Sequence, residues 1–128
     1  MYEKEIMKGK EIVDEIKEVE KKINTLNEAM EKREKEILGI CLTECETERE
    51  LLKYEKLLDM KRNELDNDSK MNVILKERLG LMNKKRTLLK ELYEVLCKII
   101  PEYKQIDIYW IEIKFDDIKK IFEKMEDD

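Results

Sequence analysis

The sequence predicts a mainly α-helical fold: an elongated helical hairpin or coiled-coil bundle with a small C-terminal strand-plus-helix segment. Charged residues make up 46% of the 128 residues, and the chain has only three glycines and one proline, a composition typical of long-helix proteins. Apolar residues recur with a spacing of three and four, which places them on one face of a helix. After Pro101 the pattern changes to an alternation that is typical of a strand.

The first helical stretch extends from about residue 3 to residue 65. Its apolar seam consists of Ile12, Ile16, Val19, Ile23, Leu26, Met30, Ile37, Ile40, Leu51, Tyr54, Leu58 and Leu65. The stretch forms either one helix or two helices that meet between Gly39 and Thr47, where two pairs have capping-box spacing, Thr43 with Glu46 and Thr47 with Glu50. Because no strong helix breaker lies there, a single helix of about 60 residues is the preferred prediction.

A turn is expected at residues 66–69, where short polar side chains compete for backbone hydrogen bonds. Asp68 or Ser69 is expected to cap the next helix. The next helix is predicted over about 70–100 and has two adjacent seams. The first comprises Leu75, Leu79, Met82, Arg86, Leu89, Tyr93, Leu96 and Ile100, and the second Ile74, Leu81, Leu88, Leu92, Val95 and Ile99. So broad a stripe needs more than one neighbouring helix, so we expect either a third helix from the same chain or a second copy of the chain.

Pro101 is expected to end that helix, which separates a coiled-coil stalk (1–100) from a small C-terminal knob (101–128). Residues 105–115 alternate as in a strand, with a change of phase after Trp110. Asp116 or Asp117 is expected to cap a final helix. The inner face of that helix would be Ile118, Ile121, Phe122 and Met125.

Several classes of chemistry find no support in the sequence. The chain has no histidine, its glycines are too scattered for a phosphate-binding loop, and no catalytic motif stands out. The net charge is -5 with both signs interleaved, so we expect no nucleic-acid or membrane partner. The basic run Lys84–Lys90 is interpreted as a solvated helix flank rather than a phosphate-binding patch.

The three cysteines indicate a reducing, cytoplasmic location. Cys41 and Cys45 are four residues apart, on one face of the expected helix. They could form half of a metal site or a redox pair, with Cys97 as a third ligand. We favour the alternative that all three are small buried apolar residues, and predict no metal and no cofactor.

The predicted function is a non-catalytic coiled-coil scaffold or interaction protein that self-associates, as a dimer, and docks a protein partner. The alternative is a small helical chaperone or adaptor that sequesters an amphipathic segment of a partner. In that case the wide apolar face from Ile37 to Cys45 and the two seams of the second helix would be partly vacant in the free protein. Arg33 and Arg86 interrupt the seams, where each either pairs with an acidic residue across an interface or extends to water.

The residues predicted to bind the partner are in the C-terminal segment: Tyr103, Ile108, Trp110, Phe115 and Phe122. Aromatic residues dominate interface hot spots, although the same residues could instead form the core of the knob. The run Arg86–Cys97 is similar to a stretch of the spindle-midzone microtubule-bundling family, over about a dozen residues of generic helical pattern. This resemblance implies no function, and no family is identified.

Overall fold

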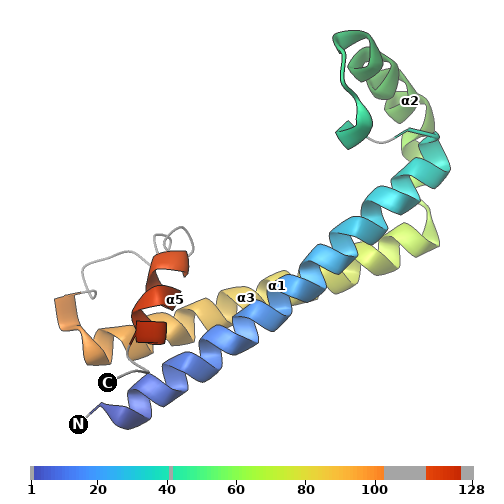
Figure 1. Cartoon of the computed structure of the whole chain (residues 1–128). Coiled ribbons are helices and arrows are strands. Elements are labelled where there is room, and N and C mark those ends of the chain that lie inside the picture. Colours follow the sequence, from blue (N-terminus) through green and yellow to red (C-terminus); the bar gives the residue numbers. More distant parts are fainter. Residues whose placement is uncertain (1, 41, 103–114, 125–128) are drawn as a thin grey trace. The chain divides into compact units, whose positions relative to one another are not determined.

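Helices account for most of the chain that the computed structural model describes, which comprises residues 2–40, 42–102 and 115–124. They are α1 (Glu3–Leu38), α2 (Glu48–Asp66), α3 (Ser69–Ile99) and α5 (Phe115–Lys124), with a short 3-10 helix, η1 (Leu42–Glu44), between α1 and α2 (Figure 1). The mainly helical class is thus confirmed. The expected strand over 105–115 lies outside the described residues except for Phe115, which begins α5. Asp116 and Asp117 therefore lie in the first turn of α5 and do not precede it as caps.

The prediction of one helix over residues 3–65 is wrong, and the alternative of two helices is correct. Gly39 follows α1 with φ of +78°, a left-handed conformation that favours glycine and commonly ends helices. Its amide donates to the Lys35 carbonyl at 2.7 Å. Lys61 Nζ donates to the Ile37 carbonyl at 2.8 Å, which satisfies one of the carbonyls left open at the helix end.

Of the two pairs with capping-box spacing, Thr47 with Glu50 lies at the start of α2, whereas Thr43 lies within η1 and caps no α-helix in the described residues. Thr47 Oγ1 accepts a hydrogen bond from the Glu50 amide at 3.2 Å, as in a capping box. The Glu50 carboxylate accepts one at 2.8 Å from the Glu46 amide, one residue before the cap. Cys45 precedes this cap and lies outside any helix. The expected placement of Cys41 and Cys45 on one helical face is therefore wrong, and Cys41 itself lies outside the described residues.

The predicted turn at residues 66–69 is confirmed, since α2 ends at Asp66 and α3 begins at Ser69. Asp68 caps α3, because its Oδ2 accepts from the Met71 amide at 2.8 Å. At the other end, α3 stops at Ile99, two residues before Pro101, as predicted. Short-range side-chain chemistry thus determines both ends of this helix.

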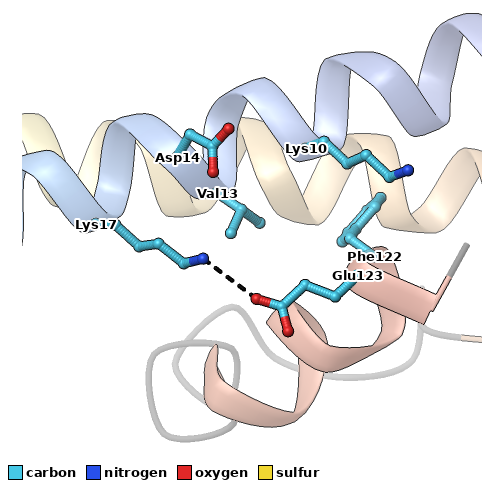
Figure 2. A pocket seen from close by; sticks show the side chains of 6 residues that line it. All are labelled: Lys10, Val13, Asp14, Lys17, Phe122 and Glu123. Carbon is cyan, nitrogen blue, oxygen red and sulfur yellow. Dashed lines mark hydrogen bonds and ion pairs between the residues drawn. The ribbon is translucent and has the colours of Figure 1, made fainter. Parts of the chain in front are cut away.

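The chain forms two compact units, of which the first comprises residues 1–21 and 82–128. Its buried apolar residues come from α1, α3 and α5: Ile12, Val13, Ile16, Val19, Leu88, Leu89, Leu92, Val95, Leu96, Cys97, Phe115, Ile118 and Phe122. Ion pairs join α1 to each of the other helices, Glu20 to Lys85 at 3.6 Å and Lys17 to Glu123 at 3.2 Å. Phe122 of α5 lies against Gly9 in the first half of α1, and Figure 2 shows α5 beside this part of α1. In this unit α5 is the third helix that the broad stripe of α3 requires.

The second unit comprises residues 22–81. Ile37, Leu38 and Tyr54 are its buried cluster, and the partly buried residues packed against them are Ile40, Cys45, Leu57, Leu58 and Leu65. The Tyr54 hydroxyl donates to the Glu34 carboxylate, so α2 is tied to α1 by a polar contact as well as by apolar packing. Arg78 Nε on α3 donates to Asn27 Oδ1 on α1 at 2.7 Å. Ile37, Leu38, Ile40 and Cys45, the apolar residues next to Gly39 in this cluster, are thus packed within the unit, whereas Leu42 is 50% exposed.

Candidate docking surfaces

The structure describes two of the five residues predicted to bind a partner. Tyr103, Ile108 and Trp110 lie outside the described residues. Phe115 and Phe122 are buried, and the Phe122 side chain is fully buried at 0% exposure. Both rings are in the core that α5 shares with α1 and α3, so a partner could contact them only after α5 moves away. Partner binding by this aromatic set stays a prediction.

Phe122 lies directly over Gly9 of α1. A Cβ atom added at Gly9 would lie 2.2 Å from Phe122 Cε1 and 2.6 Å from Cζ, far inside van der Waals contact. Gly9 therefore allows the ring to contact the backbone of α1. Sequence reasoning misses this role, because the only local signal is a glycine inside a helical pattern.

A pocket of about 410 Å³ lies beside this contact, lined by Lys10, Val13, Asp14, Lys17, Phe122 and Glu123. Figure 2 shows Lys17 of α1 and Glu123 of α5 meeting across it. Val13 and Phe122 supply apolar surface, and the other four residues supply charges of both signs. None of the six has a thiol, hydroxyl or imidazole group. The pocket thus offers charged and apolar contacts and no candidate for nucleophilic catalysis by Ser, Cys or His.

Arg33, which interrupts the apolar seam of α1, forms an ion pair within the chain. Its Nε and Nη2 donate to the two carboxylate oxygens of Asp68 at 2.9 and 2.6 Å, and its Nη1 donates to Glu36 Oε2 at 2.8 Å. The Asp68 side chain is 13% exposed. Hydrogen bonds from Arg33, then from the Met71 amide, lower the pKa of Asp68 from its ordinary 3.8 to about 2. The same pairing raises the pKa of Arg33.

We expect this pairing to make stability depend on pH below about 4. Because the folded-state pKa of Asp68 is lower than 3.8, the ionised carboxylate stabilises the fold at higher pH. That contribution is lost as the pH falls from about 4 through about 2. Asp68→Asn, which keeps a capping oxygen but not the charge, should flatten this part of the pH profile of the urea midpoint. Asp66→Asn, at an exposed position in the same turn, should not; equal flattening in both variants would contradict the assignment.

The first half of α3 has an uncovered apolar stripe. Leu75, Leu79 and Met82 lie on one helix face by their spacing of four and three, and they are 41%, 59% and 40% exposed. We call this stripe the α3 face. Leu89 and Leu96 continue the same seam and are buried at 4% and 0%. The expectation that a further helix of the chain covers the broad stripe is therefore met for the second half of α3 only, within the described residues.

The charged residues that flank the α3 face are basic. Lys76, Arg86 and Lys90 are exposed, and none of them has an ion-pair or hydrogen-bond partner in the part of the chain that the structure describes. Lys85 belongs to the same run but pairs with Glu20. The exposure of Lys84, Arg86 and Lys90 agrees with the prediction that this run is a solvated helix flank. That prediction did not take into account the exposed apolar stripe beside the run.

Within the described residues, neither a metal-binding cluster nor a membrane-spanning helix is found. Residues 2–40, 42–102 and 115–124 contain no group of three or more His, Cys, Asp or Glu side chains arranged to hold a metal ion. Within the same ranges, no helix is both long enough and apolar enough to cross a bilayer. Cys97 is buried and Cys45 partly buried, which suits the interpretation of these two cysteines as apolar packing residues.

Comparison with known proteins adds no functional assignment. No protein-family model matches the chain, and neither a curated protein nor a solved structure is significantly similar to it. Function must therefore be inferred from the surfaces themselves.

Proposed function

We propose that this chain is a non-catalytic, cytoplasmic coiled-coil scaffold that self-associates and docks a protein partner. The observation that supports it is the uncovered apolar surface on helices whose other faces pack into the two cores. Large apolar side chains exposed along a helix favour contact with another helix.

The exposed apolar residues of α2 suit contact with a second copy. Leu52 and Met60, two helical turns apart, are 59% and 80% exposed. Lys56 lies between them on the same side, with Glu55 directly before it, and Asp59 lies three residues after it on the same side. Because charges of both signs are interleaved there, two copies of α2 can face each other without net repulsion. This surface is therefore our candidate for self-association.

The mass of the protein in solution tests self-association. At micromolar concentration, light scattering should give at least twice the 15.6 kDa mass of one chain. The double variant Leu52→Glu/Met60→Glu should return to the mass of one chain, because it places like charges at the centre of the contact. Leu79→Glu, an equally exposed leucine on α3, is the matched control and should keep the larger mass. A monomeric mass for the unmodified protein would refute self-association.

A chaperone or adaptor function is the second candidate, and the α3 face favours it. This face leaves an apolar stripe uncovered beside unpaired basic side chains, as a protein that sequesters an amphipathic segment of a partner requires. The stretch from Ile37 to Cys45, expected to be partly vacant under this function, is instead largely filled by the contacts of Ile37 and Leu38 with Tyr54. The docking site of an adaptor would thus be on α3.

A further inference from the structure

We propose that the α3 face, Leu75, Leu79 and Met82 with the flanking Lys76, Arg86 and Lys90, binds an acidic amphipathic helix of a protein partner. This inference rests on the partner-docking part of the proposed function and specifies the partner's chemistry. All six residues belong to one helix, so their spacing follows from helix geometry alone.

The shape of the stripe favours a helix as its occupant. Leu75, Leu79 and Met82 form a single seam one residue wide, and Arg86 occupies the next seam position. A narrow seam with a spacing of four and three matches the knobs of a second helix. An anionic membrane surface would require a wider apolar face, commonly with Trp or Phe, and the stripe has neither aromatic residue.

The charges beside the stripe favour an acidic occupant. Lys76 lies three residues before Leu79, and Arg86 and Lys90 continue the series from Met82 in steps of four, so all three lie on the stripe's side of α3. Glu77, two residues from both leucines, and Glu91, one residue after Lys90, point to other sides. Glu94, the next member of the series after Lys90, is acidic and exposed, and it lies beyond the exposed stripe, twelve residues after Met82. Arg86 in particular is at a seam position without a carboxylate partner in the described chain. A partner's glutamate opposite it would supply one.

A second copy of this chain does not fit the same face. If two α3 faces met in antiparallel orientation, Leu79 would lie opposite Met82, and Leu75 opposite Arg86, of the other copy. The charged side chains flanking the contact would then be basic on both copies, and like charges that face each other across an interface weaken association. The α3 face therefore differs from the mixed-charge surface of α2, which suits self-association.

Binding of designed helical peptides tests the inference directly. The probe is a fluorescent peptide of about four heptads with Leu at a and d and Glu at e and g, compared with one that has Lys at e and g. Fluorescence anisotropy with the full chain should show binding of the Glu peptide and none of the Lys peptide. Leu79→Glu should weaken this binding about tenfold or more. Leu52→Glu, on α2, is the matched control and should leave it unchanged.

Charge reversal provides the sharper outcome. The triple variant Lys76→Glu/Arg86→Glu/Lys90→Glu should no longer bind the Glu peptide and should bind the Lys peptide instead. Circular dichroism checks that the variant stays helical. Failure of the chain to bind the Glu peptide, or equal binding by Leu79→Glu, would overturn the inference. So would sedimentation with phosphatidylserine-containing vesicles that is lost in Leu79→Glu. Self-association is measured separately through α2, so a dimer that ignores the Glu peptide refutes only the partner's chemistry.

Discussion

Replacement of Phe122 with alanine is expected to lower the free energy of unfolding by about 3–5 kcal/mol. The ring is fully buried between α5 and α1 and contacts the backbone at Gly9, so its removal leaves a cavity that the neighbouring helices cannot easily fill. The α5 helix has only ten residues and is not stable by itself. We therefore expect α5 to detach, with faster amide hydrogen exchange over 115–124. Urea unfolding followed by circular dichroism measures the loss.

The matched control for this truncation is Leu79→Ala. Leu79 is also a large apolar residue in a helix, but it is 59% exposed and lies outside both cores. Its truncation should change the free energy of unfolding by no more than about 0.5 kcal/mol. Equal losses in the two variants, or unchanged exchange in α5, would show that Phe122 does not anchor that helix.

Features that depend on neighbours in the sequence were predictable. Thr47 caps α2 through an amide three residues away, and Asp68 caps α3 in the same way. The turn at 66–69 and the end of α3 before Pro101 follow from similarly local chemistry. The break after α1 was only one of two alternatives, because a helix tolerates a single glycine at a cost of about 1 kcal/mol. Packing of Tyr54 against Ile37 and Leu38, contacts the sequence does not show, favours the two-helix alternative.

Features that depend on distant parts of the chain were not predictable. The seam positions Leu75 and Leu79 have the same periodicity as Leu89 and Leu96, yet only the latter pair is buried. Their difference reflects where other helices pack, which periodicity cannot show. Arg33 illustrates the same limit: its partner, Asp68, lies within the chain at the start of another helix, and spacing alone could not identify it. The candidate docking face therefore emerged from exposure and not from pattern.

Alanine at Gly9 and alanine at Gly80 are expected to change stability in opposite directions. Both glycines lie inside helices, so each substitution should gain about 0.5–1 kcal/mol of intrinsic helix stability. At Gly80 no atom in the described part of the chain lies within 4 Å of the added Cβ, so that gain should be measured in full. At Gly9 the methyl group would lie 2.2 Å from the buried Phe122 ring. Such overpacking typically costs about 1–3 kcal/mol, so Gly9→Ala should lower the urea midpoint.

The sign of the Gly9 effect should reverse when Phe122 is also alanine. Without the ring, the methyl group enters the space that the ring occupied, and only the gain in helix stability and some recovered packing remain. The double variant should therefore be more stable than Phe122→Ala alone, with a coupling energy of about 1–3 kcal/mol. Gly80→Ala combined with Phe122→Ala should be additive, since nothing connects the two positions. A Gly9→Ala loss of equal size in both backgrounds would mean that the helix resists the methyl group for a reason other than Phe122, and that α5 is not held at Gly9.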